Sequence, residues 1–221
     1  MNAHDLVQAL RRELAPDERD NRLVTAVAQG RAPREVIGAL AAEEARIVAS
    51  DRRSFLLLAA RAVQPAAVDF FTGLAQGEGL AMATLPALAA AAGLDEAGVR
   101  AYRVQAGCQA YPAYLAWLAL SGDPVEVTAA VLANFAAWGG YCATLARALR
   151  DRYDFDDQAC AFLDFFATSG EDADPSPLEA HAFRAIEARL AAGDTLSNSR
   201  EYGRLLQNYE LMFWNTLADT H

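Results

Sequence analysis

The sequence predicts an all-α protein, and three observations support this fold class. Alanine is abundant and β-branched residues are sparse, so the local conformational bias is helical. Apolar residues recur at helical spacing along nearly the whole chain. No segment shows the alternating pattern of a β-strand, and no repeat or low-complexity tract is present.

The length and composition predict one large core. The chain has 221 residues, and 53% of them are hydrophobic, which excludes wholesale disorder. We therefore expect a single domain over residues 1–221, with residues 1–18 as a peripheral N-terminal helix.

The charge and the cysteines restrict partners and compartment. The formal net charge is −10 and every basic residue is arginine, so neither nucleic acid nor an anionic membrane is an expected partner. The first residues lack the apolar core of a signal peptide, and no apolar run has the length and flanks of a membrane span. Cys108, Cys142 and Cys160 form no CxxC motif, which favours a reducing, cytoplasmic location.

In the first half of the chain, helix boundaries coincide with Gly and Pro residues. The expected helices are Leu6–Leu14, Asp20–Gln29, Pro33–Val63, Pro65–Leu74 and Thr84–Ala92. Gly30 ends the second of them, and Pro33 and Pro65 suit the first turn of the next two.

The second half carries a clear stop and start at Gly122 and Asp123. Gly122 ends one helix, Asp123 caps the next, and Pro124 takes its first position. The expected helices are Asp95–Val104, Tyr111–Leu120, Pro124–Arg152, Asp157–Ala167, Leu178–Ala192 and Ser199–Ala218. Ser169–Pro177 is acidic and rich in proline, which is typical of an exposed loop.

Several polar side chains project into the apolar faces of these helices. Glu210 falls in the apolar arc of the last helix, and Asn134 lies in the middle of the apolar face of residues 124–152. Glu44 and Asp51 lie two turns apart in the apolar stripe of residues 33–63, whereas Glu43 projects off that stripe.

Tyrosines add to this pattern, because Tyr111 and Tyr114 share a face with two leucines. A buried polar group must be paired, hydrogen-bonded or protonated. Each such residue alone could be a satisfied core residue, but polar groups on four helices together predict a ligand pocket between them.

At these positions the sequence resembles the TenA/THI-4 family. Residues 209–214 (Tyr-Glu-Leu-Met-Phe-Trp) are similar to its Tyr-Glu-x-x-Phe-Trp signature, and residues 30–35 are similar to its Gly-Thr-Leu-Pro-x-Glu entry to the long helix. Residues 111–115 resemble its Tyr-x-x-His/Tyr-Leu motif, and residues 129–134 resemble the segment that ends in its catalytic cysteine.

The resemblance implies a fold, a pocket and an oligomeric state. It implies a haem-oxygenase-like bundle of about seven or more helices, a homo-oligomer (dimer or tetramer) and a small heteroaromatic, thiamin-related ligand. It implies that Glu210 is the acid/base and that Glu44 stands at the substrate-binding aspartate. With the helix projections, we expect substrate contacts from Tyr111, Asn134, Asp51, Tyr114, Trp138, Tyr209 and Phe213. We expect no cofactor and no metal.

Three departures from the family pattern change the expected chemistry. Asn134 stands where the family has its nucleophilic cysteine, Ile47 replaces a tyrosine, and residues 159–162 alter an aromatic segment. An amide is not a nucleophile, and Cys142 projects about 80° away from Asn134 on the same helix. The resemblance to family members that lack the cysteine therefore implies a cysteine-independent, aminopyrimidine aminohydrolase-like enzyme that cleaves a C–N bond through carboxylates.

Three alternatives stay open at this point. The first is a non-catalytic ligand-binding or assembly protein with the same pocket. The second is a haem-oxygenase-like metal oxygenase, although the chain has only three histidines and none are paired at ligand spacing. The third is a transcription factor, since residues 88–99 have helix-turn-helix spacing, but that segment is acidic.

Overall fold

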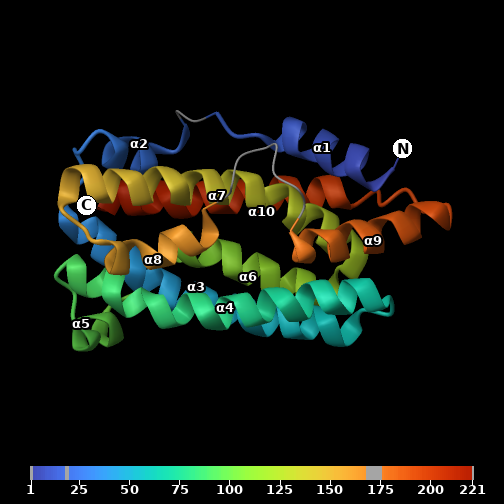
Figure 1. Cartoon of the computed structure of the whole chain (residues 1–221), viewed down its shortest axis with the longest axis horizontal. Helices are drawn as coiled ribbons and strands as arrows, with labels where there is room; N and C mark the ends of the chain where they lie inside the picture. The colour runs from blue at the N-terminus through green and yellow to red at the C-terminus, as the bar shows by residue number, and fades with distance from the viewer. Residues whose placement is uncertain (1, 18–19, 168–175, 221) are drawn as a thin grey trace.

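The computed structural model describes residues 2–17, 20–167 and 176–220, and every regular element in these ranges is a helix (Figure 1). The helices are α1 (Ala3–Leu14), α2 (Arg22–Ala28), α3 (Arg34–Arg61), α4 (Pro65–Ala91), α5 (Glu96–Ala101), α6 (Ala106–Ser121), α7 (Pro124–Tyr153), α8 (Asp157–Phe166), α9 (Pro177–Ala191) and α10 (Ser199–Thr220). The all-α prediction is confirmed. Most of the predicted linker Ser169–Pro177 lies outside the described residues.

Two pairs of long helices build the molecule. α7 and α10 lie side by side along the long axis, and α3 and α4 form a second pair (Figure 1). α6 packs against both α3 and α10, and α8 and α9 both pack against α4 and α7. α1 and α2 cover α7 and α10 from outside. The helices therefore enclose an interior region between the two pairs.

The core consists of two hydrophobic clusters. One contains Ile37, Val48 and Trp214, and the other contains Phe55, Phe71 and Leu206. Tyr111 on α6 packs against both clusters. The interior site described below lies where these clusters meet.

The course of α4 corrects the sequence prediction. Residues 65–91 form one continuous helix, whereas the sequence predicted two helices, Pro65–Leu74 and Thr84–Ala92. A Cβ at Gly77 would lie 3.6 Å from the Phe165 ring of α8. The packing of α4 against α3 and α8 thus outweighs the low helix propensity of its glycines.

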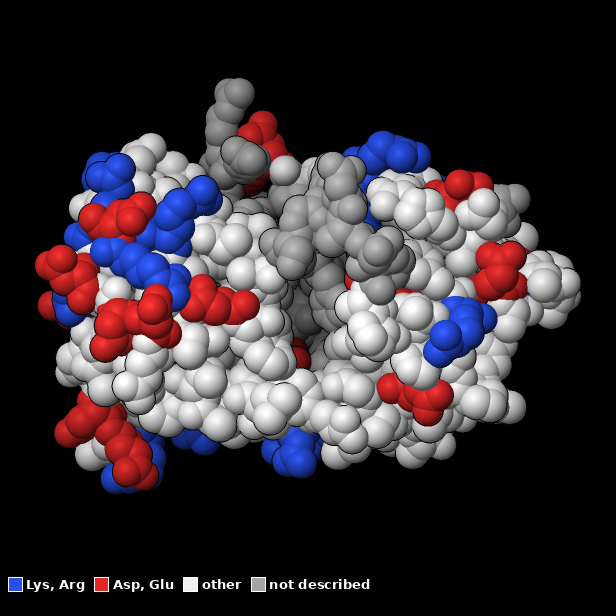
Figure 2. Space-filling view, in the orientation of Figure 1, with Lys and Arg blue, Asp and Glu red and all other residues white. Residues whose placement is uncertain are grey.

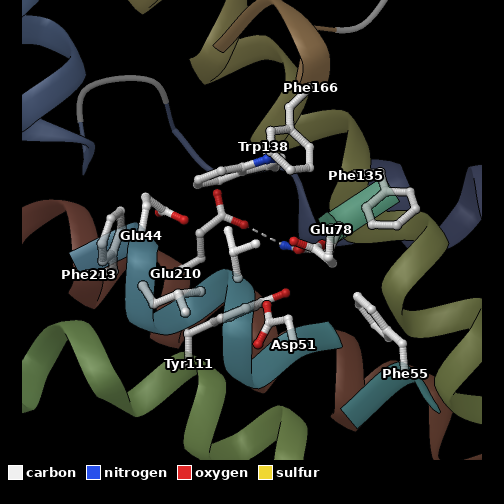
Figure 3. A pocket seen from close by; sticks show the side chains of 13 residues that line it. Glu44, Asp51, Phe55, Glu78, Tyr111, Phe135, Trp138, Phe166, Glu210 and Phe213 are labelled. Atoms are coloured by element: carbon white, nitrogen blue, oxygen red, sulfur yellow. Dashed lines mark hydrogen bonds between the residues drawn. The ribbon is translucent and has the colours of Figure 1, made fainter. Parts of the chain in front are cut away.

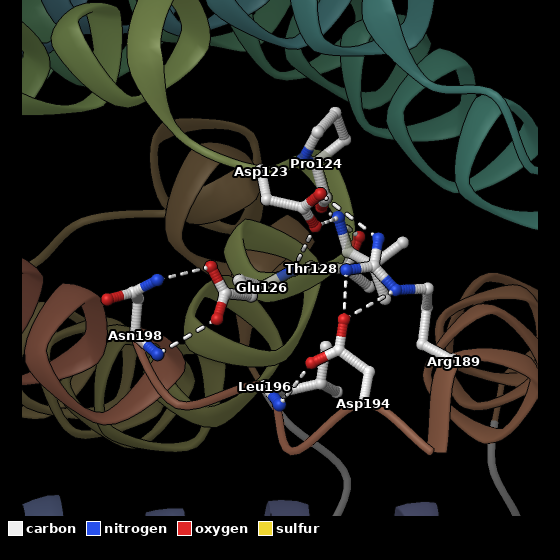
Figure 4. A network of polar contacts seen from close by, with 9 residues as sticks. Asp123, Pro124, Glu126, Thr128, Arg189, Asp194, Leu196 and Asn198 are labelled. Carbon is white, nitrogen blue, oxygen red and sulfur yellow. Dashed lines mark hydrogen bonds and ion pairs between the residues drawn. The ribbon is translucent and has the colours of Figure 1, made fainter. Parts of the chain in front are cut away.

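The stop and start at Gly122 is confirmed and is tied to the C-terminal half of the chain (Figure 4). Asp123 Oδ1 accepts hydrogen bonds from the backbone N–H groups of Val125 and Glu126, at 2.9 and 3.2 Å. Its Oδ2 pairs with Arg189 of α9 at 3.0 Å. Glu126 accepts two hydrogen bonds from Asn198, just before α10. The start of α7 is thereby fixed to α9 and α10.

The long helix α7 contains an extended apolar stretch. Its length and its mean hydropathy of 1.2 over 18 residues would suffice to cross a membrane. However, 61% of that window is buried among the other helices, which is typical of the core helix of a globular protein.

Candidate functional site

The interior pocket is lined by side chains from six helices (Figure 3). Its volume is about 60 Å³, several times the space that one water molecule needs. The lining residues are Glu44, Ile47, Val48, Asp51, Phe55, Glu78, Tyr111, Asn134, Phe135, Trp138, Phe166, Glu210 and Phe213. Figure 2 shows a hollow near the centre of one face, with acidic residues (red) visible inside it.

Glu210 is held at the pocket wall by two hydrogen bonds. Asn134 Nδ2 donates to Glu210 Oε2 at 2.8 Å, and Trp214 Nε1 donates to Glu210 Oε1 at 3.4 Å. Asn134 Nδ2 also donates to Gln207 Oε1 at 3.2 Å. These contacts fix the orientation of the carboxyl group and satisfy the buried amide of Asn134.

Burial tunes Glu210 for proton transfer. Loss of solvation raises its pKa to about 7, while the hydrogen bonds from Asn134 and Trp214 oppose the rise because they stabilise the carboxylate. A carboxyl with such a pKa can give and take a proton near neutral pH.

Glu44 and Asp51 are also buried, with 3% and 5% of their surfaces exposed. Burial raises the pKa of both groups well above the usual range, and the negative charge of Glu78 adds to the effect. Burial likewise raises the pKa of the Tyr111 hydroxyl, so that hydroxyl is neutral and able to donate a hydrogen bond.

The balance of charge in the pocket is one-sided. Its wall carries four carboxyl groups, on Glu44, Asp51, Glu78 and Glu210, and its lining includes no arginine. Aromatic rings make up much of the remaining wall. Carboxylates and ring faces both favour a cation, so the arrangement suits an organic amine.

The structure brings seven of the nine predicted site residues to this pocket: Glu210, Glu44, Asp51, Tyr111, Asn134, Trp138 and Phe213. Tyr114 and Tyr209 do not line it. Their rings pack against each other, with centroids 5.3 Å apart, and Tyr114 also stacks on Trp117. Tyr209 lies on a different face of α10 from Glu210, because consecutive residues of a helix are rotated by about 100°.

Sequence reasoning missed Glu78. This residue lies in the stretch of α4 that was expected to be non-helical. Burial raises its pKa to about 8. Four buried residues of α4 flank Glu78 at helical spacing. Phe71 and Leu74 lie seven and four residues before it, and Ala81 and Leu85 lie three and seven residues after it. That spacing could have shown that Glu78 lies in an apolar stripe.

Glu43 was also placed wrongly, because it is fully buried rather than off the packed face of α3. Its carboxylate accepts hydrogen bonds from the Gln105 backbone N–H at 2.7 Å and from Gln109 Nε2 at 2.6 Å. Both donors belong to the start of α6. Glu43 therefore anchors α6 to α3 and does not face the pocket.

The remaining nucleophile candidate does not reach the pocket. Cys142 is fully buried and absent from the lining, and burial raises its thiol pKa well above the usual value. A neutral thiol is a poor nucleophile. Among the residues that the structure describes, no three His, Cys, Asp or Glu side chains are grouped so that they could hold a metal ion.

A second, larger hollow of about 990 Å³ lies between α1, α2, α7 and α10. Gln207 lines it, and the buried Nε2 of that residue has no hydrogen-bond partner. Because Gln207 Oε1 binds Asn134, this side chain separates the second hollow from the acidic pocket.

The fold and the site together define a helical-bundle protein with an acidic, aromatic pocket in its interior. A family model described as the TENA/THI-4/PQQC family matches residues 22–219, so the chain belongs to that family. A search among curated proteins finds no match.

Solved structures share the fold along the whole chain. A domain of unknown function with a haem oxygenase-like fold from Shewanella denitrificans aligns with a TM-score of 0.77 and 14% identity, covering 100% of this chain and 93% of the other. A TenA homologue from P. horikoshii gives 0.72 and 14%, covering 100% of both chains. A TenA family transcription regulator from a Silicibacter species gives 0.71 and 18%, covering 96% of both. The haem-oxygenase-like fold predicted from the sequence is thus confirmed.

Proposed function

We propose that this protein hydrolyses a C–N bond of a small heteroaromatic amine without a cysteine nucleophile. Glu210 acts as the general acid/base, and Glu44 holds the amine. One observation carries the proposal: a buried carboxyl group with a pKa of about 7 faces a pocket whose lining supplies no cation. The resemblance to the TenA/THI-4 family suggests a thiamin-related pyrimidine as the substrate.

The proposed step needs only water and the carboxyl groups. Ionised Glu210 removes a proton from a water molecule while the water oxygen forms a bond to the ring carbon that bears the amino group. Protonated Glu210 then gives that proton to the departing nitrogen as the C–N bond breaks. The products are a hydroxyl-substituted ring, or its carbonyl tautomer, and free amine.

The wall of the pocket supports binding of a flat ring. Trp138 stacks near Trp214 with ring centroids 5.3 Å apart, and Trp138, Tyr111 and Phe213 all line the pocket. Rings of this kind offer stacking and cation–π contacts. Asn134 positions Glu210 through their 2.8 Å hydrogen bond.

Glu210→Gln tests the role of the acid/base. We expect a decrease in turnover of about 100- to 10,000-fold with an aminopyrimidine, because an amide cannot relay the proton. Glu96→Gln is the matched control, because Glu96 is exposed on α5, and it should retain wild-type turnover. Turnover that survives unchanged in Glu210→Gln would refute the proposed mechanism.

The second candidate is a non-catalytic binding protein of the same fold, which the amide at position 134 favours. It predicts that aminopyrimidines raise the melting temperature of the wild type while no product appears over long incubation. Product formation that depends on Glu210 excludes this candidate.

A further inference from the structure

Glu44 and Asp51 lie toward opposite ends of one apolar strip of the pocket, and the negative charge of Glu78 acts on both of them. Glu44 and Asp51 lie on α3, seven residues apart, and helix geometry separates their backbone positions by about 10 Å. Ile47 and Val48 line the pocket between them. Figure 3 shows Glu44 and Glu210 toward the Phe213 side, and Asp51 and Glu78 toward Phe55 and Phe135.

The Asp51 end of the pocket contains a buried polar atom that lacks a partner. Asp51 is only 5% exposed, and its Oδ1 is buried without a hydrogen-bond partner. Glu78 lies close enough for its negative charge to disfavour ionisation of Asp51. A buried carboxylate without a partner is unfavourable, and a bound cation removes that penalty.

The proposed reaction does not use this end. Glu210 and Glu44 account for one amine, whereas Asp51 and Glu78, when ionised, would repel an anionic group and attract a cationic one. Phe55 and Phe135 line the same side, and their ring faces attract cations as well.

We propose that the natural ligand carries two basic nitrogens at its two ends, one held by Glu44 and Glu210 and the other by Asp51 and Glu78. This inference rests on the proposed function only in assigning the first nitrogen to the Glu44 end. The apolar strip requires a slender, uncharged connection between the nitrogens, roughly as long as two helical turns.

Chain length and charge can be tested separately with simple amines. The probes are hexane diamine, ethylene diamine and hexylamine, and the readouts are the melting temperature and the dissociation constant from calorimetry. We expect hexane diamine to bind the wild type at least about tenfold more tightly than hexylamine, which has the same six-carbon chain, because the diamine gains a second ion pair. Ethylene diamine is too short to span both ends and should bind no better than hexylamine.

Two variants locate the second nitrogen. Asp51→Asn and Glu78→Gln should each abolish the preference for hexane diamine over hexylamine while leaving the affinity for hexylamine within about twofold. Asp151→Asn is the matched control, because Asp151 is exposed on α7, and it should keep the preference.

The outcomes separate this inference from the proposed function. A wild type that binds both six-carbon amines equally, or an Asp51→Asn variant that keeps the preference, overturns the inference even if Glu210-dependent hydrolysis is observed. Stabilisation by Mn²⁺ or Fe²⁺ in place of the diamine, lost in Asp51→Asn, also overturns it. A retained preference in a protein that hydrolyses nothing supports the inference while refuting the reaction.

Discussion

Asn134 is the residue whose contacts distinguish this pocket from one built around a thiol. Its amide donates to Glu210 Oε2 at 2.8 Å and to Gln207 Oε1 at 3.2 Å. A hydrogen bond to the ionised form lowers the pKa of a carboxyl group, so Asn134 opposes the effect of burial on Glu210. The asparagine, together with Trp214, therefore lowers the pH at which Glu210 changes its protonation state.

Replacing Asn134 should shift that pH. In Asn134→Leu the carboxylate loses a donor, so we expect the pKa of Glu210 to rise above about 7. The pKa can be read from carbon-13 NMR of labelled glutamate, or from the pH dependence of turnover. Asn208→Leu, at an exposed position of α10, is the control. An unchanged titration of Glu210 in Asn134→Leu would contradict the role given to this hydrogen bond.

At the scale of single residues, sequence reasoning succeeded where one helix face decides burial. Glu210, Glu44 and Asn134 stand inside strong apolar stripes, and all three are buried. The same reasoning failed for Glu43, because α3 packs against both α4 and α6 and is buried on more than one face. A helical projection of one segment contains no information about a second neighbour.

At the scale of elements, sequence reasoning failed in the glycine-containing segment of α4. The sequence predicted two helices where α4 runs continuously through Gly77 and Gly79, and Glu78 between these glycines lines the pocket. A glycine can mark the end of a helix or a close contact between two helices, and only the tertiary structure shows which of the two applies. For this reason the largest omission in the candidate site lies in this segment.

The crossing of α6 and α10 provides a test of such packing. A Cβ at Gly107 would lie 2.0 Å from Thr216 Oγ1 and 3.0 Å from Thr216 Cβ. We expect Gly107→Ala to lower the free energy of unfolding by about 1–3 kcal/mol in urea denaturation. Gly140→Ala on α7 is the control, because no atom lies within 4 Å of its added Cβ. That change should raise stability by about 0.5–1 kcal/mol, and a matching loss in both variants would argue against the crowding.

The N-terminus of α7 provides a second test. Asp123 caps two backbone N–H groups and pairs with Arg189. We expect Asp123→Ala to lower the free energy of unfolding by about 1–2 kcal/mol. Asp151→Ala, near the C-terminal end of the same helix, should change it by less than about 0.5 kcal/mol. Equal effects of the two substitutions would show that the cap contributes nothing specific.

At the scale of the whole molecule, the buried carboxyl groups determine how stability depends on pH. Folding raises the pKa of Glu78 to about 8 and that of Glu210 to about 7, from ordinary values of 4.5. The folded state therefore binds more protons than the unfolded state between these values, and its stability falls as the pH rises. The loss reaches at most about 1.4 kcal/mol per pH unit for each group.

We therefore expect the ligand-free protein to melt at a lower temperature at pH 8 than at pH 5.5, as measured by calorimetry. Glu78→Gln removes the group that titrates at the highest stated pKa, so its melting temperature should depend less on pH between 7 and 8. Glu96→Gln should retain the wild-type dependence. A wild-type melting temperature that increases steadily from pH 5.5 to pH 8 would contradict the raised pKa values.

The four carboxyl groups of the pocket can also hold protons that are released when a ligand binds. When the pocket is empty, burial raises the pKa of these groups and favours their protonated form, whereas a bound cation favours their ionised form. Binding an amine dication near neutral pH must therefore expel protons into the surrounding buffer. The heat of binding will then include the heat of neutralising those protons. Titrations in buffers with different ionisation enthalpies would count the protons released and show how many of the four groups change state.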